Sequence, residues 1–362
     1  MGIQDYFLDG NTSQGYLTLV RHVVVGCDNV YIIKGSISKE KTKLFKEISE
    51  LFEKDNYLVQ WLHNPSDEAE LDGIIIPEKS IAVIDGSSRN GIEANYGLFS
   101  KDRFDLDEVI SKEQLYDHKK TIIGLQNEYE IMHKQAYQQF NKGREIHEQK
   151  EKLYIAAMDF EKANKVTEDL IKTIFVDISV KVEKPIIAQL FFGASTPNGA
   201  VNYIENITSE IKKRYIIKGR SGCGKSTVMR KVAKYAENIG LAVQYFPCGL
   251  DPDSLDMIII PTLSVAIIDG TAPHVIDPTR HTDQVVDMFE LCMDKTVETK
   301  YDKEFEQLHS NYRDEVRTGT NFLQEAKKAR NSLEEYYQEA VNVIALKEKF
   351  NEIIAVLTKE LR

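Results

Sequence analysis

The chain has 362 residues, of which 42% are hydrophobic and 28% are charged, and its formal net charge is −11. No apolar run approaches the roughly 20 residues of a membrane helix, and the first residues lack the basic lead and apolar core of a secretory signal. A broad nucleic-acid surface needs clustered Lys and Arg, which this acidic chain does not favour. We therefore expect a cytoplasmic globular protein with no membrane or nucleic-acid partner.

Two copies of one sequence unit make up the chain. Aligning the chain with itself places Lys41 on Lys225 and Asp85 on Asp269, each pair 184 residues apart (225 − 41 and 269 − 85). Beyond Gly86 the separation falls to 176, because the first copy carries eight more residues there (184 − 176). A register held over this length indicates a gene duplication.

Each copy combines an apolar, alternating core with a long polar tail. The second core alternates short apolar runs with one helical pattern, at 213–219, 225–240, 241–248 and 264–270. Such alternation is typical of an α/β domain with a parallel, doubly wound sheet. We predict two domains, 1–183 and 184–362, divided near "VEKP" at Val182–Pro185, because proline disfavours helix in the residue before it.

Both tails carry apolar residues at steps of three and four, which predicts amphipathic helices. The stripes comprise Ile122, Leu125, Tyr129, Met132, Ala136 and Phe140 in the first tail, and Tyr301, Phe305, Leu308 and Tyr312 in the second. We expect long hairpins or coiled-coil arms, with the stripes packed in a core. Binding of a protein partner through these helices is the alternative. The sequence leaves the oligomeric state open.

A glycine-rich motif lies between the first strand and the helix of the second core. "GRSGCGKS" fits G-x-x-x-x-G-K-[ST] in full and has the strand–turn–helix context that the motif requires. Its glycines allow successive N–H groups to face one concavity, at the positive end of a helix. The predicted nucleotide-binding residues are Gly219, Arg220, Ser221, Gly222, Cys223, Gly224, Lys225, Ser226 and Thr227.

We predict ATP and Mg²⁺ as the ligands of this motif. Lys225 would reach the β- and γ-phosphates and Thr227 would lie near the α-phosphate. Ser226 and Asp269, which ends the apolar strand "SVAIID", would hold Mg²⁺. Gly270 follows Asp269, where many hydrolases carry a glutamate that activates water, so the sequence does not favour strong hydrolysis by the usual route.

The segment "TAPHVIDPTR" follows Asp269, at the strand end where α/β folds place ligands. We predict that His274 and Asp277 act with Lys225 and Asp269 as catalytic residues, positioning an acceptor or water. The alternative is a plain loop in which Asp277 caps a turn against the next proline. Asp256 matches Asp72 of the first copy, which favours a structural role for both.

The first copy departs from the motif at its glycines. Ser38 and Glu40 stand where the second copy has Gly222 and Gly224, although Lys41 remains. Side chains at these positions obstruct the loop, and a carboxylate there repels phosphate. We predict one nucleotide per chain.

The whole chain resembles a bacterial family of tandem P-loop ATPase-like proteins, variously labelled ATPase or nucleotide kinase. The resemblance rests on "FGASTPNG", the glycine-rich motif, "DPDSLDMIIIP", "AIIDGTAPHVIDP" and the duplicated tails. It implies two tandem three-layer domains of the P-loop NTPase superfamily, each with a parallel sheet and a helical hairpin or coiled-coil extension. It also implies ATP with Mg²⁺ and leaves the substrate open.

Three functions remain open at this point. The first is a Mg-ATP-binding ATPase or nucleotide-dependent switch with a single competent site in the second copy. The second is a kinase that acts on a nucleotide or another small molecule. The third is a scaffold in which bound ATP is structural and the helices engage a protein partner. Phosphate release with and without an acceptor separates them.

Overall fold

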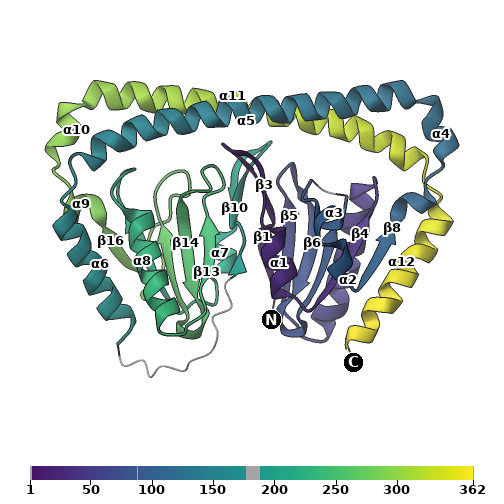
Figure 1. Cartoon of the computed structure of the whole chain (residues 1–362), viewed down its shortest axis with the longest axis horizontal. Helices are drawn as coiled ribbons and strands as arrows, with labels where there is room; N and C mark the ends of the chain where they lie inside the picture. The colour runs from purple at the N-terminus through teal and green to yellow at the C-terminus, as the bar shows by residue number, and fades with distance from the viewer. Residues whose placement is uncertain (1, 88, 177–187, 362) are drawn as a thin grey trace.

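The computed structural model describes residues 2–87, 89–176 and 188–361. Figure 1 shows two α/β cores that stand side by side and two long helices that run across both. One core comes from the first repeat and the other from the second. The predicted α/β class is therefore confirmed, whereas the boundary predicted between 183 and 184 lies outside the described residues.

Each core contains a six-stranded sheet, and the two sheets have equivalent strand orders. The first sheet consists, in spatial order, of β1 (Ile3–Phe7), β5 (Val59–Asn64), β6 (Asp67–Ile76), β7 (Ile81–Asp85), β4 (Asn29–Lys34) and β8 (Asp102–Asp105). The second consists of β9 (Ala188–Gln189), β13 (Gln244–Pro247), β14 (Leu255–Ile260), β15 (Val265–Asp269), β12 (Lys213–Lys218) and β16 (Gln284–Asp287). The duplication read from the sequence is thus a duplication of the fold.

Both sheets are mixed, so the prediction of a parallel sheet was wrong in one respect. β12 runs parallel to β15 and β16, but β14 runs antiparallel to both β13 and β15. β6 has the same reversed direction in the first sheet. The cause is the link between β14 and β15, a single 3₁₀ turn at Pro261–Leu263, because a parallel pair needs a crossover of a dozen or more residues.

A pair of β-hairpins holds the two cores together. β2 (Asp9–Thr12) pairs with β3 (Gly15–Thr18), and β10 (Gly193–Thr196) pairs with β11 (Gly199–Asn202). Phe7 and Phe191, which precede the hairpins, exchange backbone hydrogen bonds of 2.9 and 3.0 Å. The matching "NTSQG" and "STPNG" segments are therefore hairpin turns at the junction of the repeats.

The remaining shorter elements complete the two cores. The helices that follow β4 and β12 are α2 (Ser38–Lys54) and α8 (Lys225–Asn238). The other short helices are α1 (Val20–Gly26), α3 (Ile92–Tyr96), α4 (Lys112–Asp117), α7 (Ile204–Ile207), α9 (Met288–Cys292) and α10 (Thr296–Lys300). Further 3₁₀ turns lie at Pro77–Lys79, Gly97–Phe99, Leu106–Val109 and Lys359–Leu361.

The two long helices pair with each other. α5 (Lys119–Ile155) runs from the first core to the second, and α11 (Asp302–Glu339) returns from the second core to the first (Figure 1). They approach closely at Gly319, where an added Cβ would lie 2.4 Å from the Phe140 ring. Ala136 and Phe140 of the first apolar stripe pack against Leu323 of α11, whereas Tyr301 and Phe305 of the second stripe pack against the second core.

The helices that follow the long pair pack on the opposite core. α6 (Phe160–Ile174) comes from the first repeat but packs against α8 and α9 of the second. α12 (Val343–Thr358) comes from the second repeat but packs against the first core. The prediction of a helical hairpin within each domain was therefore wrong, because each tail buries its apolar face on the other repeat.

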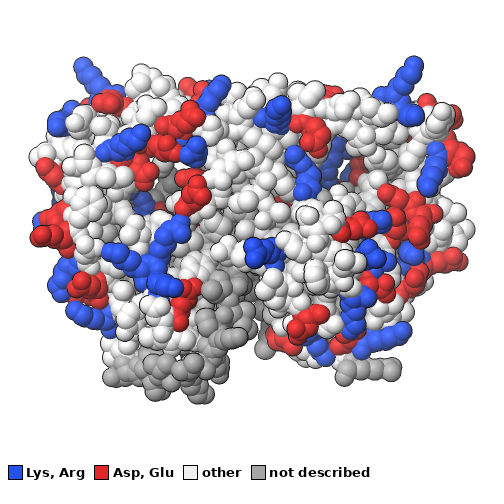
Figure 2. Space-filling view, viewed as in Figure 1, with Lys and Arg blue, Asp and Glu red and all other residues white. Residues whose placement is uncertain are grey.

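On the face drawn in Figure 2, positive and negative side chains are intermixed over both cores and the long helices. Across the described ranges, no helix combines the length and apolar character needed to cross a membrane. All four cysteines are free thiols.

Candidate functional site

The segment Gly219–Gly224, which we call the glycine-rich loop, joins β12 to α8. Gly222 and Gly224 have φ angles of 77° and 76°, a left-handed backbone conformation that residues other than glycine rarely adopt. The helix α8 begins directly afterwards at Lys225. The first N–H groups of a helix have no partner within the helix, so the loop presents backbone donors and the positive end of the helix dipole.

The first repeat lies directly against this loop. A Cβ added at Gly222 would lie 2.7 Å from the backbone oxygen of Glu151, at the end of α5. One added at Gly224 would lie 2.9 Å from Cε of Met158. Gly222 is therefore required twice, by the backbone conformation of the loop and by the close approach of the α5 backbone, whereas Gly224 is required by its backbone conformation, because the flexible end of Met158 can move aside.

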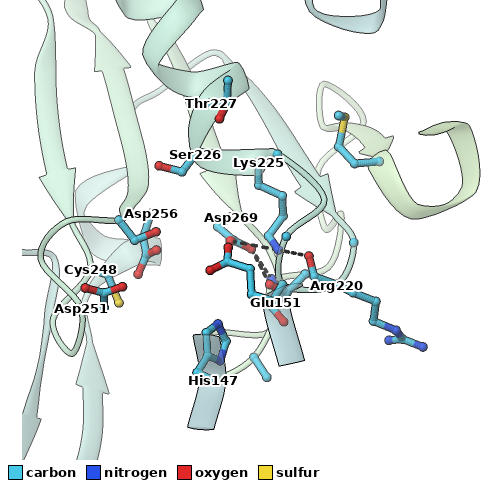
Figure 3. Close-up of a pocket in the computed structure, with 18 of the residues that line it drawn as sticks. His147, Glu151, Arg220, Lys225, Ser226, Thr227, Cys248, Asp251, Asp256 and Asp269 are labelled. Carbon is cyan, nitrogen blue, oxygen red and sulfur yellow. Dashed lines mark hydrogen bonds and ion pairs between the residues drawn. The ribbon is translucent and has the colours of Figure 1, made fainter. Parts of the chain in front are cut away.

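Lys225 and Asp269 converge beside the loop (Figure 3). The pairing of β12 with β15 sets Asp269 opposite Ile217, next to the start of the loop. Lys225 Nζ donates to the backbone oxygen of Arg220 at 2.8 Å and lies 3.6 Å from Asp269 Oδ2. Because the Lys225 side chain is only 9% exposed, water screens its charge little inside the site.

Ser226 and Asp269 are the donors that could hold Mg²⁺. Asp269 Oδ1 accepts from the N–H of Thr271 at 3.0 Å and from its hydroxyl at 2.5 Å. Ser226 Oγ accepts from the Leu255 N–H at 3.0 Å, which leaves its own proton and a lone pair for another group. No cluster of three His, Cys, Asp or Glu residues suited to a metal occurs in the described parts of the chain. The two donors therefore fit an ion that takes most of its ligands from phosphate and water, as Mg²⁺ does.

A cavity of about 590 Å³ opens in front of the loop, within the usual range for small-molecule sites. Besides the loop and the start of α8, the residues that line it from the second repeat include Gly193, Ala194, Ser195, Ala200, Cys248, Asp251, Asp256, Asp269, Thr271, His274, His309 and Tyr312. Those from the first repeat are Arg144, His147, Lys150, Glu151, Ile155, Met158, Phe160, Ala163, Asn164 and Thr167. The cavity is thus formed by both repeats.

Four ionisable residues of α5 line the cavity, Arg144, His147, Lys150 and Glu151, and none of them was predicted from the sequence. Burial lowers the pKa of His147, and the positive charges of Lys150 and Lys225 add to this effect. Burial also lowers the pKa of Lys150, together with the charge of Arg220. Burial and the nearby Asp251 carboxylate raise the pKa of Glu151. No local motif marks these residues, because the exchange of tails alone brings them to the site.

Of the residues predicted after Asp269, His274 reaches the cavity. Its ring is buried against Phe192, with a centroid distance of 5.0 Å, and Nδ1 has no hydrogen-bond partner. Burial lowers the pKa of His274 to about 4, so the ring is neutral at pH 7. Asp277 does not line the cavity. Its exposed carboxylate accepts a hydrogen bond from Lys218 Nζ at 2.7 Å instead. Asp277 therefore stays apart from the Lys225–Asp269 pair.

Asp256 lines the cavity from β14, beside Cys248. Burial raises its pKa to about 7, and the negative charge of Asp269 acts in the same direction. The predicted loop residue Cys223 turns into the protein core, where its sulfur accepts from the Arg220 N–H at 3.2 Å. Figure 3 shows the Arg220 side chain extending away from Lys225 and Asp269. It pairs with Glu298 at 2.6 Å.

The equivalent loop of the first repeat has a different conformation. α2 begins at Ser38, so residues 38–40 are helical where the second repeat forms its glycine-rich loop. The Glu334 carboxylate of α11 accepts from the N–H groups of Ser38 and Lys39 at 3.2 and 3.1 Å. Lys41 Nζ is bound to Asp85 at 2.6 Å, with both side chains buried. An internal carboxylate therefore satisfies the donors that a phosphate would need.

Larger side chains also fill the first repeat beside this loop. Asp9 and Tyr16 stand where the second repeat has Gly193 and Ala200, and the Tyr16 hydroxyl donates to Asp9 at 2.6 Å. Arg89 lies over the Tyr16 ring, 4.9 Å from its centroid. The space that is open in the second repeat is thus occupied in the first.

Comparisons with known proteins add no assignment to this geometry. No protein-family model matches the chain, and neither a curated protein nor a solved structure matches it.

Proposed function

We propose that the second repeat is a P-loop-type site that binds Mg-ATP and acts as a nucleotide-dependent switch. The observation that carries this proposal is the convergence of the glycine-rich loop, the N-terminus of α8, Lys225 and Asp269 at one cavity. Backbone donors at a helix N-terminus with an adjacent lysine are suited to a polyphosphate. The buried Ser221 hydroxyl, which has no hydrogen-bond partner, fits a phosphate oxygen as acceptor.

Ser226 and Asp269 would hold Mg²⁺, which neutralises charge on the phosphates when it is bound. Lys225 would exchange its 2.8 Å bond to the Arg220 oxygen for the phosphates. Lys150 adds a second positive charge from the first repeat. The chain's own residues therefore supply donors and charge for the phosphates, with both repeats contributing.

The switch follows from the place of Glu151. The backbone N–H of Gly222 faces the Glu151 carboxyl group and favours its charged form, in a place equivalent to that of Glu334 at the α2 N-terminus of the first repeat. A carboxylate and a phosphate compete for the same donors and repel each other. Nucleotide binding would displace Glu151, and the rigid α5 would carry that displacement toward the first core.

A kinase remains a second candidate, favoured by the polar end of the cavity. His274 is neutral with Nδ1 unpaired, and Asp256 has a pKa near neutrality. A carboxyl group with the pKa of Asp256 is suited to accept a proton from a hydroxyl near pH 7, whereas His274 is a weak base at that pH and would only accept a hydrogen bond at Nδ1. If an acceptor hydroxyl bound at this end of the cavity, the terminal phosphate would be transferred to that hydroxyl rather than to water.

The proposal is tested by calorimetric titration of the protein with Mg-ATP. Lys225→Ala is expected to weaken binding by at least about a hundredfold, because it removes a charge that contacts the phosphates. Lys234→Ala is the matched control, since Lys234 is an exposed lysine of the same helix and should leave affinity unchanged. Equal affinity of the Lys225→Ala protein and the parent would refute the site. Phosphate release with and without a mixture of hydroxyl acceptors then separates switch, ATPase and kinase.

A further inference from the structure

The cavity has a second end, away from Asp269, that lies between α6 and α8. Met158, Phe160, Ala163, Asn164 and Thr167 line it from the first repeat. Thr227, Val228 and Lys231 of α8 line the facing side. This end is therefore a boundary between the repeats, built mainly by the exchanged tail.

The equivalent region of the first core is filled. The helices α6 and α12 start at equivalent N-caps, Asp159 and Asn342. Four and eight residues after the cap, α6 has Ala163 and Thr167, whereas α12 has Leu346 and Phe350. Leu346 and Phe350 are buried in the first core. The small residues of α6 thus leave open a space that large apolar residues occupy in the other repeat.

Apolar surface and polar groups meet at this open end. Phe160 is 59% exposed, although it lines a cavity, and Met158 touches the glycine-rich loop at Gly224. Asn164 Oδ1 accepts from Lys231 Nζ at 2.7 Å, so the oxygen is engaged and the amide hydrogens are the groups left to donate. A flat ring with acceptor atoms at its edge suits an exposed aromatic side chain beside an amide donor.

The orientation expected for a bound triphosphate would also place the nucleoside at the end of the cavity between α6 and α8. The lysine of a glycine-rich phosphate loop reaches the β- and γ-phosphates, so the terminal phosphate lies toward Lys225 and Asp269. Thr227, two residues farther along α8, also lines the cavity, as does Lys231, which donates to Asn164 of α6. The nucleoside would therefore extend past Thr227 toward α6.

We propose that the pocket between α6 and α8 binds the nucleobase of the nucleotide, so that the tail of the first repeat recognises the base whose phosphates the second repeat holds. This inference rests on the function proposed above. It assigns Phe160 as a stacking residue and Asn164 as a hydrogen-bond donor to the base.

The test compares Mg-ATP with inorganic tripolyphosphate, which has the phosphates and no base, by calorimetric titration of the full chain. Phe160→Ala and Ala163→Leu are expected to weaken ATP binding at least about tenfold and to leave tripolyphosphate binding unchanged. Val343→Ala is the matched control, because Val343 is the exposed residue of α12 equivalent to Phe160.

Each outcome has one meaning. Equal ATP affinity of Phe160→Ala, Ala163→Leu and the parent, while both ligands bind through Lys225, would overturn the base pocket and leave the proposed function standing. A parallel loss of both ligands in Phe160→Ala would assign a structural role to that residue and also overturn the pocket. If the parent bound neither ligand, the proposed function would fail and the pocket with it.

Discussion

The segments that follow β4 and β12 began as one element. They now differ in the source of the negative charge at the start of the helix that follows. In the first repeat, Glu334 of α11 is bound at the start of α2, and Lys41 is paired with Asp85. In the second repeat, Glu151 occupies the equivalent place, eight residues before the N-cap of the next helix, but lines an open cavity. A helix N-terminus accepts any suitable anion, so a carboxylate of the protein can take the place that a phosphate would have.

The largest expected contrast comes from removing the two equivalent lysines. Lys41→Ala leaves the buried Asp85 carboxylate without its 2.6 Å partner, and we expect a loss of about 3 kcal/mol in the free energy of unfolding with ATP affinity unchanged. Lys225→Ala should change the free energy of unfolding little and weaken ATP binding, because Lys225 lies 3.6 Å from Asp269 and its proposed role is to bind the phosphates. Urea unfolding and ATP titration of both variants measure the contrast. Lys41→Met serves if Lys41→Ala does not fold, and the same pattern in both lysine variants would contradict the distinction between the repeats.

The second contrast concerns the pH dependence of stability. The pKa of Asp256 rises to about 7 in the folded protein from its ordinary value of 3.8, so the folded state keeps a proton that the unfolded chain has lost. The resulting stability is complete below pH 4 and is lost as the pH rises to 7, by on the order of 2 to 4 kcal/mol. Asp256→Asn should make the fall in stability between pH 4 and 8 smaller in urea unfolding without Mg²⁺ or nucleotide, while the buried Asp9 and Asp72, whose pKa values are also raised, keep part of it.

The control for this slope is Asp253→Asn, since Asp253 is an exposed aspartate in the turn before β14. Its profile should match that of the parent. An unchanged slope in Asp256→Asn would show that this carboxyl group is ionised in the folded protein.

The third contrast lies in the long helix pair. Gly319 packs on Phe140, where a Cβ added to the glycine would lie 2.4 Å from the ring, whereas the nearest atom to a Cβ on Gly143 lies at 3.4 Å. We expect Gly319→Ala to lower the free energy of unfolding by about 1 to 3 kcal/mol, because it overpacks the contact. Gly143→Ala should change it much less. Equal losses of stability for Gly319→Ala and Gly143→Ala in thermal unfolding would mean that α5 and α11 do not pack closely at Phe140.

The smallest contrast compares the two carboxylates. Glu151→Gln removes a negative charge from the proposed phosphate site, and we expect ATP to bind roughly three- to tenfold more tightly. Glu334→Gln should leave ATP affinity unchanged, because the first repeat lacks the loop and Lys41 stays bound to Asp85. Titration of both variants decides this. Weaker ATP binding in Glu151→Gln would show that Glu151 assists the nucleotide rather than competing with it.

Local chemistry made much of this molecule predictable. The glycines, the apolar strand before them and the helix after them determine the loop of the second repeat, and the acid that ends β15 falls beside it. Glu151 and Phe160 could not be found in this way, because they reach the cavity only through the exchange of tails. An amphipathic stripe specifies which face of a helix is buried and leaves its partner undefined, so the pairing of α5 with α11 did not follow from the pattern.

The most direct test of a single competent site is the number of ATP molecules bound per chain, measured by equilibrium dialysis with saturating Mg-ATP. We expect one in the parent and none in Lys225→Ala. Two molecules per chain, or one that persists in Lys225→Ala, would contradict the assignment of the site to the second repeat.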